Sequence, residues 1–269
     1  MTTDLHNHVI PGVDDGAADV HASREALRAF VADDVGQVIA TPHLMGSITL
    51  ESAALALRLA ELDVGWERLR VVAGEFPGLA VRRGCEVMLD VPEPSFEDER
   101  LRLGGGVTVL VEFPFMMVPP QAARPLAVIA GQGLRPLLAH AERYAGVTVE
   151  GVEEWRQAGA GIQVNGPSLL GKHGDGPRRV ALELLERGLV DCLSSDYHAR
   201  SRPLVAEYRA YLLEHGAEEQ AGLLMDVNPA RAVAGERMIP IGPVRLRRPG
   251  LLSSISSLWR RPRRRRERG

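Results

Sequence analysis

Two clusters of histidine and carboxylate side chains lie near opposite ends of this 269-residue chain. Residues Asp4–His8 read DLHNH, and residues Ser195–His198 read SDYH. Because strand side chains alternate with a period of two, the imidazoles of a His-x-His pair lie on one face of a strand. Imidazole is the commonest metal-binding side chain, and carboxylates complete the coordination of hard or borderline divalent ions. The two clusters therefore predict a metal site.

A lone histidine is more often a surface or core residue than a ligand, and a His-x-His pair occurs by chance in many proteins. The metal interpretation is favoured because a carboxylate lies within two residues of a histidine in both clusters. These pairs are Asp4 with His6 and Asp196 with His198.

Length and composition are those of a globular protein. Hydrophobic residues make up 45% of the 269 residues, enough to bury a sizeable core in one large domain or two smaller ones. The longest apolar runs, such as Val35–Ala40 and Val107–Val111, are shorter than the ~18 residues that span a bilayer. The N-terminus lacks the basic and apolar regions of a secretory signal, so we expect a cytoplasmic protein.

The two cysteines, Cys85 and Cys192, lie in apolar, strand-like stretches. Neither belongs to a Cys-x-x-Cys pair or begins the Cys-x5-Arg loop of a thiol phosphatase. We therefore expect both to be buried small apolar residues and expect no cysteine nucleophile.

Charge is divided unevenly along the chain. From Arg245 to the end there are ten arginines and one glutamate, a net charge of +9. Because the formal net charge of the whole chain is −3, residues 1–244 carry −12. Lys172 is the only lysine beside 31 arginines, which we attribute to GC-rich coding.

Strand-like apolar runs alternate with helical stretches, the pattern of parallel βα units. The seven predicted strands cover residues 3–6, 36–41, 80–89, 108–113, 135–139, 161–165 and 192–195. The longer predicted helices cover residues 18–34, 50–75, 122–131, 151–157 and 178–187. Three short helices are expected to close the body.

Seven such strands fit either a closed barrel or an open doubly wound sheet. The position of the candidate ligands separates the two, since nearly all lie at or just past the C-terminal end of a strand. They are His6, His8, His43, Glu112, His140, Asp196 and His198. Such ends converge on one mouth in a βα barrel but are spread along a line in an open sheet. We therefore predict an α/β barrel.

Eight short motifs follow one another at the ends of successive predicted strands. They are Asp4-x-His6-x-His8, Pro11-Gly12-x-Asp14-Asp15-Gly16, Thr41-Pro42-His43, Gly84-x-Glu86, Val111-Glu112, His140-x-Glu142-Arg143, Val164-Asn165 and Ser195-Asp196-x-His198. In this order they resemble the polymerase-and-histidinol-phosphatase (PHP) superfamily, and within it the CpsB/CapC branch of capsular-polysaccharide-type tyrosine-protein phosphatases. The resemblance covers about residues 1–235.

The resemblance implies a distorted TIM-like (β/α)7 barrel of the PHP type over residues 1–240. It implies up to three divalent ions at the C-terminal mouth, manganese first, with iron or zinc as alternatives. One ion would take His6, His8, Glu86 and Asp196; the second would take Glu86, Glu112 and His140; the third would take Asp15, His43 and His198. Asp14 is an alternative to Asp15, or a hydrogen-bond partner of a ligand histidine.

The metal ions would supply the nucleophile of a phosphatase. A metal lowers the pKa of bound water from ~15.7 toward ~7, so a hydroxide bridging the ions could attack phosphorus at neutral pH. Arg143 offers a planar fork for phosphate oxygens, the alternative being an ion pair with Glu142. Arg202 is predicted as a second phosphate contact.

Aromatic side chains near the mouth, Phe113, Phe115 and Tyr144, either face the substrate ring or pack in the core. Two residues depart from the branch: Leu44 replaces a second histidine after Pro-His, and Ala141 replaces a proline. Neither departure removes an implied ligand. Loss of the proline would loosen the loop that aims Arg143 and so change activity or substrate range.

Residues 241–269 are predicted to form a basic, flexible tail. Its apolar side chains recur at helical spacing before a run of arginines: Leu251, Leu252, Ile255, Leu258 and Trp259. Such a segment can place a protein at the inner face of the membrane by binding anionic lipid. The alternatives are nucleic acid and a solvated tail, and the acidic body argues against nucleic acid.

These features predict a metal-dependent protein-tyrosine phosphatase. A phenol leaving group, with a pKa near 10, needs less help from a general acid than an alkyl alcohol does. The resemblance implies that the substrate is a bacterial tyrosine autokinase of exopolysaccharide or capsule biosynthesis. The alternatives are a small-molecule phosphatase of the histidinol phosphate type and a noncatalytic metal-binding regulatory module.

Overall fold

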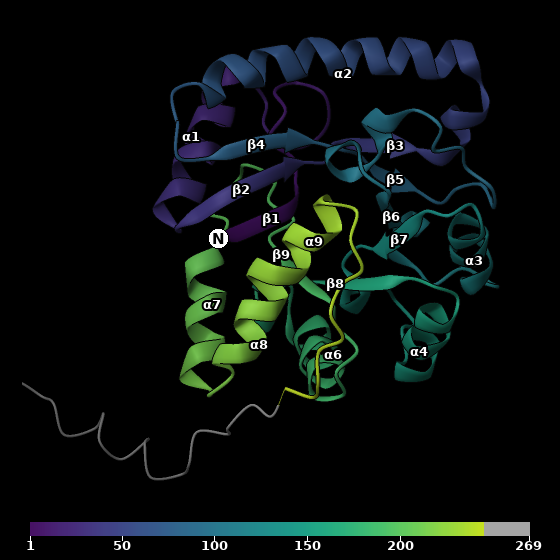
Figure 1. The fold of residues 1–269 in the computed structure, drawn as a ribbon, viewed down its shortest axis with the longest axis vertical. Helices are drawn as coiled ribbons and strands as arrows, with labels where there is room; N and C mark the ends of the chain where they lie inside the picture. The colour runs from purple at the N-terminus through teal and green to yellow at the C-terminus, as the bar shows by residue number, and fades with distance from the viewer. Residues whose placement is uncertain (245–269) are drawn as a thin grey trace, which may run out of the picture.

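The computed structural model describes residues 1–244, in which parallel strands curve into a barrel with helices outside it (Figure 1). The strands are β1 (Thr2–Asn7), β2 (Val35–Ala40), β3 (His43–Met45), β4 (Ala80–Arg83), β5 (Glu86–Met88), β6 (Thr108–Glu112), β7 (Arg135–Leu138), β8 (Gly161–Asn165) and β9 (Cys192–Ser194). The α-helices are α1 (Val20–Ala32), α2 (Ser52–Ala73), α3 (Ala123–Gly131), α4 (Val149–Gln157), α5 (Gly166–Leu169), α6 (Asp175–Glu186), α7 (Val205–Glu214), α8 (Glu218–Gly222) and α9 (Asn228–Val233). Short 3-10 segments are η1 (Gly46–Leu50), η2 (Glu99–Leu101), η3 (Leu103–Gly105), η4 (Pro114–Met116) and η5 (Ala141–Arg143), and η6 (Leu223–Val227) is a short π-helix.

The strands form two parallel sheets with the orders β1-β2-β4 and β3-β5-β6-β7-β8-β9. The prediction of one strand over residues 80–89 was wrong, because the chain divides there into β4 and β5. Strand β3 was not predicted. The chain thus breaks twice, between β2 and β3 and between β4 and β5. At the first of these breaks Pro42 has no N–H to donate, and its carbonyl accepts from Glu86 N at 3.0 Å. The two breaks distort the barrel beside the candidate ligands His43 and Glu86.

Strands β1 and β9 close the barrel. The backbone N–H groups of Leu5 and His6 both donate to Ser194 Oγ at 3.0 Å. Past the end of β9, Asp196 N donates to His6 O at 2.9 Å, and His8 N donates to Tyr197 O at 2.8 Å. The parallel sheets and this closure confirm the predicted barrel. They bring the His6–His8 cluster next to the Asp196–His198 cluster.

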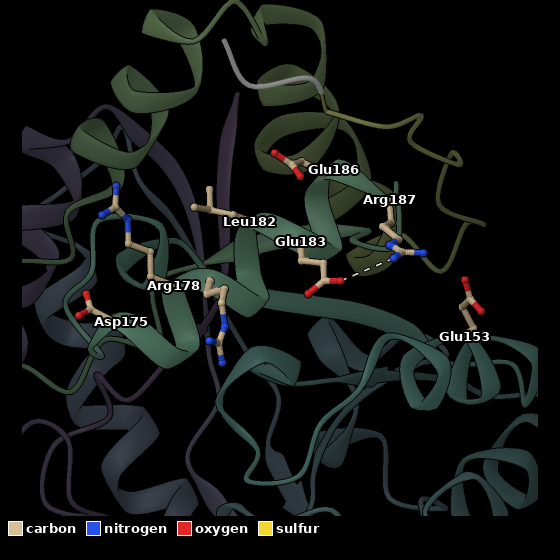
Figure 2. A pocket seen from close by; sticks show the side chains of 8 residues that line it. Glu153, Asp175, Arg178, Leu182, Glu183, Glu186 and Arg187 are labelled. Atoms are coloured by element: carbon tan, nitrogen blue, oxygen red, sulfur yellow. Dashed lines mark ion pairs between the residues drawn. The ribbon is translucent and has the colours of Figure 1, made fainter. Parts of the chain in front are cut away.

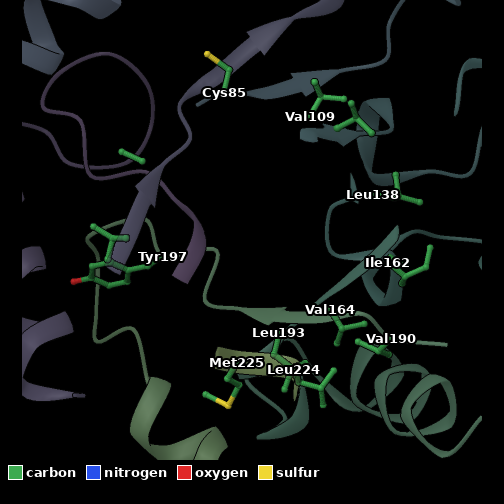
Figure 3. Close-up of a cluster of buried hydrophobic side chains, with 14 of the residues drawn as sticks. Cys85, Val109, Leu138, Ile162, Val164, Val190, Leu193, Tyr197, Leu224 and Met225 are labelled. Carbon is green, nitrogen blue, oxygen red and sulfur yellow. The ribbon is translucent and has the colours of Figure 1, made fainter. Parts of the chain in front are cut away.

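The core has two layers, because successive strand side chains face opposite sides of the sheet. Val109, Leu138 and Ile162 point outward and pack with residues beneath the helices (Figure 3). Leu110 and Leu137 point inward and share a smaller buried cluster with residues of β1 and α9. Each such fully buried side chain contributes about 1.5–3 kcal/mol. The two layers hold the strand ends in place.

The described chain ends against the body. Ile241 and Val244 are buried, and Val244 N donates to Leu185 O at 2.9 Å. Residues 245–269, which include the predicted apolar face and the arginine run, lie outside the described residues. Within residues 1–244, no helix combines the length and the hydropathy needed to cross a bilayer.

Candidate metal centre

The nine side chains predicted as metal ligands lie together at the C-terminal ends of the strands. They are His6, His8, Asp15, His43, Glu86, Glu112, His140, Asp196 and His198. They form four overlapping groups, and within each group one ligand atom of every member lies within 4.8 Å of the others. The prediction that strand ends converge on one mouth is borne out by this geometry.

Glu86 stands at the middle of the cluster and is fully buried. Its Oε2 lies 3.1 Å from His6 Nε2, 3.3 Å from His8 Nε2 and 3.0 Å from His43 Nδ1. Its Oε1 lies 2.9 Å from His140 Nε2. Burial alone would raise the pKa of Glu86, but the surrounding imidazoles hold it well below its usual value. A buried carboxylate needs cationic partners of this kind, or a metal ion.

The ring orientations leave Nε2 of three imidazoles facing the cluster. His6 donates through Nδ1 to Gln163 Oε1 at 3.1 Å, and His8 donates through Nδ1 to Asp14 Oδ2 at 2.8 Å. His198 donates through Nδ1 to Asp196 O at 2.9 Å. A proton fixed on Nδ1 leaves Nε2 as a ligand, which is how metal-binding histidines are usually held.

Two of these nitrogens face each other, since His6 Nε2 and His8 Nε2 are 3.3 Å apart. Burial would lower the pKa of His6, but the charges of Glu86 and Asp196 outweigh it and raise the pKa to about 10. Burial is likewise outweighed at His43, where the nearby carboxylates of Glu112 and Glu86 raise the pKa to about 11. The same negative field attracts divalent ions, which displace protons from their ligands. The donor set therefore fits manganese, iron or zinc.

The two adjacent aspartates have different surroundings. Asp14 hydrogen-bonds the ring of His8. Asp15 Oδ1 lies 3.5 Å from His43 Nε2 and 3.3 Å from His198 Nε2. This geometry favours Asp15 as a ligand and Asp14 as the residue that orients a ligand.

Gly16 makes the tight turn that follows the two aspartates, and its N–H donates to Asp14 Oδ1 at 3.0 Å. A Cβ at this position would lie 2.1 Å from His8 O. The next residue, Ala17, donates its N–H to the same carbonyl at 2.9 Å. Only glycine allows the loop to approach β1 so closely.

Asp196 joins the cluster to Arg143. Its Oδ1 lies 3.3 Å from His6 Nε2, while Oδ2 accepts from Arg143 Nη1 and Asn165 Nδ2, each at 2.7 Å. Burial would raise the pKa of Asp196, but the charges of His6 and His140 outweigh it and lower the pKa to about 2. The carboxylate is therefore ionised at neutral pH and fixes Arg143 beside the centre.

Arg143 has no ion pair with Glu142 among the residues that the structure describes. Glu142 is buried and accepts from Asn165 N at 3.1 Å and from Ser168 Oγ at 2.6 Å. The alternative interpretation of Arg143 as a partner of Glu142 is therefore wrong, because the carboxylate turns away into the protein.

Two candidate ligand residues have left-handed backbone conformations, which residues other than glycine rarely adopt. His140 has φ 36° and Asp196 has φ 51°. Gln163, which the sequence interpretation missed, supports the first by accepting from His140 N at 3.0 Å. Gln163 Nε2 also donates to Asn165 Oδ1 at 2.8 Å. The only sequence signal for Gln163 is a polar residue in the inward register of an apolar strand.

A cavity of about 760 Å³ opens beside the centre, and its wall carries four cationic side chains. They are Arg143, Lys172, Arg200 and Arg202. Arg202, the predicted second phosphate contact, is ion-paired with Asp33 at 2.9 Å and Glu207 at 3.0 Å. Lys172 and its neighbour His173 also line this cavity, and the sequence interpretation assigned neither to the site.

The aromatic side chains near the mouth divide between core and surface. Phe113 and Tyr144 are buried against Trp155, and Tyr144 Oη accepts from Phe113 N at 3.0 Å. Core packing is therefore confirmed for these two. Phe115 is 87% exposed and does not line the cavity.

A second hollow lies on the outer surface between α4 and α6 (Figure 2). Charged side chains of both signs line it, including the ion pair of Glu183 and Arg187 at 3.7 Å. It shares no residue with the cavity at the barrel mouth. It contains no candidate ligand.

The cysteines lie apart from this chemistry. Cys85 and Cys192 are both buried and free. Burial raises the pKa of the Cys85 thiol to about 12 and that of Cys192 well above its usual value. Their burial agrees with the expectation that neither is a nucleophile.

Comparison with known proteins agrees with this geometry. The chain is 29% identical over 215 residues to the tyrosine-protein phosphatase YwqE of Bacillus subtilis, covering 78% of this chain and 83% of the relative. It is 27% identical over 243 residues to the tyrosine-protein phosphatase CpsB of Streptococcus pneumoniae, covering 86% and 97%. A chain from crystal structures of YwqE and CpsB, described as unique metal-dependent tyrosine phosphatases, superposes with a TM-score of 0.72 at 26% identity, covering 91% of this chain and all of that one.

The chain also superposes on a phosphotriesterase of Mycobacterium tuberculosis with a TM-score of 0.54 at 15% identity, covering 86% of this chain and 93% of that one. This likeness supports the barrel fold alone. The family model for capsular polysaccharide synthesis, CpsB/CapC, matches residues 2–234. The chain therefore belongs to the CpsB/CapC family.

Proposed function

We propose that the protein is a metal-dependent phosphatase that hydrolyses phosphotyrosine in proteins. The observation that carries this proposal is Glu86, a buried carboxylate surrounded by four imidazole rings at the mouth of the barrel. The centre opens into a cavity large enough for an aryl phosphate, with Arg143 on its wall. YwqE and CpsB, which are similar over most of this chain, are named tyrosine-protein phosphatases.

Nine side chains would hold up to three divalent ions. One ion would take His6, His8, Glu86 and Asp196, the second Glu86, Glu112 and His140, and the third Asp15, His43 and His198. Glu86 would serve two ions, which agrees with its four imidazole neighbours. Manganese is the ion we expect from the family resemblance. The mixed set of imidazoles and carboxylates suits manganese, iron and zinc alike.

When bound, divalent ions supply a water molecule that loses its proton near neutral pH, and they neutralise the charge of a phosphate monoester. Arg143 would bind the phosphate oxygens. One of its N–H groups is taken by Asp196, which holds the guanidinium at 2.7 Å, and the others remain for the substrate. Arg202 would make the second phosphate contact, exchanging part of its pairing with Asp33 and Glu207.

The physiological substrate we propose is the phosphorylated tail of a bacterial tyrosine autokinase of exopolysaccharide or capsule biosynthesis. Family membership in capsular polysaccharide synthesis supports this proposal. Such a kinase would bring the phosphatase to the cytoplasmic face of the membrane, and the basic tail would bind anionic lipid there.

The decisive experiment is elemental analysis of the purified protein together with hydrolysis of p-nitrophenyl phosphate before and after chelation. We expect bound divalent metal, loss of activity on chelation and recovery on adding Mn²⁺. Activity that survives complete removal of metal would sink the mechanism. A parallel assay with a phosphotyrosyl peptide and histidinol phosphate tests the substrate class, and faster turnover of histidinol phosphate would favour a small-molecule phosphatase.

A further inference from the structure

The cations on the cavity wall differ in their partners. Arg143 pairs with Asp196 at 2.7 Å, and Arg200 pairs with Asp15 Oδ2 at 2.9 Å. Arg202 pairs with two carboxylates, Asp33 and Glu207. Three of the four positive charges are therefore neutralised locally.

Lys172 is the exception. No carboxylate of residues 1–244 lies within 4.0 Å of its ammonium group, although it lines the same cavity. It is exposed, and it is the only lysine in a chain that otherwise uses arginine for its basic residues. An ammonium on a flexible stem is suited to bind an anionic group that arrives from solution.

The backbone of the loop that carries Lys172 is held in place. Lys172 N donates to Pro167 O at 3.0 Å, and Gly174 N donates to Gly171 O at 3.1 Å. Gly171, with φ 75°, makes the left-handed turn that glycine adopts without strain. These hydrogen bonds fix the position of the Lys172 backbone, from which its side chain extends at the cavity wall.

The next residue, His173, anchors the loop without adding charge. The Ser168 hydroxyl donates to Glu142 Oε1 at 2.6 Å, so the Nδ1–H of His173 donates to Ser168 Oγ at 2.8 Å. Burial and the nearby charge of Arg143 lower the pKa of His173 to about 4. At neutral pH the imidazole is uncharged, and Lys172 is the charged member of the pair.

We propose that Lys172 forms a subsite for a second anionic group of the substrate, the carboxylate of an Asp or Glu close to the phosphotyrosine. The inference rests on the proposed function, because the phosphate itself occupies the metal centre and Arg143. The net charge of residues 1–244 is −12, so an unpaired cation beside the centre gives the cavity a local preference for acidic peptides that the body lacks.

The test compares two phosphotyrosyl peptides that differ only in their flanking residues, Asp and Glu in one and Asn and Gln in the other. The full chain is assayed with Mn²⁺ at low salt. We expect kcat/KM to favour the acidic peptide by about three- to fivefold, the range of one partly exposed ion pair. We expect Lys172→Ala to abolish most of this preference and Lys172→Arg to keep it.

The matched control is Arg68→Ala, which removes an exposed cation from α2 outside the cavity and should leave the peptide preference as in the wild type. A wild-type enzyme with no preference, or a Lys172→Ala variant that keeps it, overturns the subsite. A second measurement is anisotropy of both peptides made with a nonhydrolysable phosphonate. Tighter binding of the acidic peptide that depends on Lys172 supports the subsite even if phosphate release fails and the proposed function falls.

Discussion

At the scale of single residues, Arg143 is the side chain on which we expect phosphate binding to depend most directly. It is held by Asp196 at 2.7 Å and lines the cavity. We expect Arg143→Ala to lower kcat/KM for p-nitrophenyl phosphate by about 100-fold, the range for loss of one charge-stabilising donor. Arg143→Lys should recover only part of this, because one ammonium cannot reproduce the planar fork. Steady-state kinetics with Mn²⁺ checks both variants.

The metal content of the Arg143 variants serves as the control. It should match that of the wild type, since Arg143 is not proposed as a ligand. A variant that keeps full metal occupancy and wild-type kcat/KM would show that Arg143 does not contact the phosphate.

Gln163 holds the candidate ligands His6 and His140 through one carbonyl oxygen, which accepts from His6 Nδ1 and from the backbone N–H of His140. We expect Gln163→Ala to weaken metal binding by about 10- to 100-fold, the usual effect of losing a partner of a ligand histidine. Competition with a chromophoric chelator measures the affinity.

The matched control for Gln163 is Gln37→Ala. Gln37 is also buried in a barrel strand but contacts Thr3 at 3.3 Å, away from the ligands. Equal loss of metal affinity in both variants would assign the effect to general loosening of the barrel.

The sequence predicted which histidines and carboxylates would lie together, but not the residues that support them. His6, Glu86 and Asp196 stand out because histidines and carboxylates at strand ends have a chemical reason to converge. Gln163 has no such signal, since an amide in an apolar strand becomes informative only when its neighbours are known. Asp14 and Asp15 are adjacent and chemically alike, and only the folded structure shows that Asp14 hydrogen-bonds His8 while Asp15 lies beside His198 and lines the cavity.

At the scale of elements, strand breaks were the feature that the hydrophobic pattern could not predict. Residues 80–89 were predicted as one strand, yet Gly84 lies between β4 and β5, where Gly84 N donates to Ala40 O at 2.9 Å. The alternation of strands and helices was predicted correctly because it depends on long stretches of periodic residues. A break depends on one or two hydrogen bonds between distant segments.

The turn at Gly16 gives a prediction for the loop between β1 and α1. We expect Gly16→Ala to weaken metal binding and to lower the free energy of unfolding by more than about 1 kcal/mol, because the new Cβ would overlap His8 O at 2.1 Å. Chelator competition and urea unfolding measure the two effects.

Gly176→Ala is the control for Gly16→Ala. Gly176 lies in α6, and a Cβ there would meet nothing within 4 Å. This variant should be neutral or more stable, since alanine favours the helix. A Gly16→Ala protein as stable as Gly176→Ala would contradict the close approach.

The loop between α5 and α6 should make stability depend on pH through His173. Its folded pKa is lowered to about 4 by burial and by Arg143, from an ordinary value of 6.5. Between these values the unfolded chain binds the extra proton, so His173 contributes a loss of stability as the pH falls from about 6.5 to about 4. Other groups titrate in the same range, so only the difference from a His173→Gln variant is informative.

We therefore expect the stability of the wild type relative to His173→Gln to decline over that pH window and to be level above about 6.5. Urea unfolding at pH 4.5, 5.5, 6.5 and 7.5 measures this difference. A difference that does not change with pH would mean that His173 is solvated and charged like a surface histidine.

At the scale of the whole molecule, barrel closure brings the N-terminal and C-terminal clusters of candidate ligands together. The candidate ligands His6 and Asp196 are 190 residues apart in sequence, yet Asp196 N donates to His6 O at 2.9 Å. Parallel strands put all their C-terminal ends on one side, so ligands from the whole body can meet there. The candidate ligands therefore lie at strand ends and in the loops that follow them. Helix α9 packs at the N-terminal ends of the strands, where Thr108 Oγ1 donates to Ala232 O at 2.7 Å.

Charge is also organised at this scale, with −12 on residues 1–244 and +9 on residues 245–269. An anionic membrane should repel the first part and attract the second. We expect the full chain to sediment with vesicles rich in phosphatidylserine at low salt and to be released at 0.5 M NaCl, since each basic residue near the surface contributes about 1 kcal/mol. A protein ending at Val244, which keeps the buried side chain and its hydrogen bond to Leu185, should stay in the supernatant.

Vesicles of phosphatidylcholine separate the two sources of membrane affinity in this tail. If the arginines dominate, the full chain should not sediment with these neutral vesicles; if the apolar side chains at helical spacing dominate, it should sediment with both kinds. Equal sedimentation of the full chain and of the protein ending at Val244 would contradict lipid binding by residues 245–269. Because the proposed substrate is a membrane-bound kinase, a tail that binds lipid would raise the local concentration of the phosphatase without any contact at the barrel mouth.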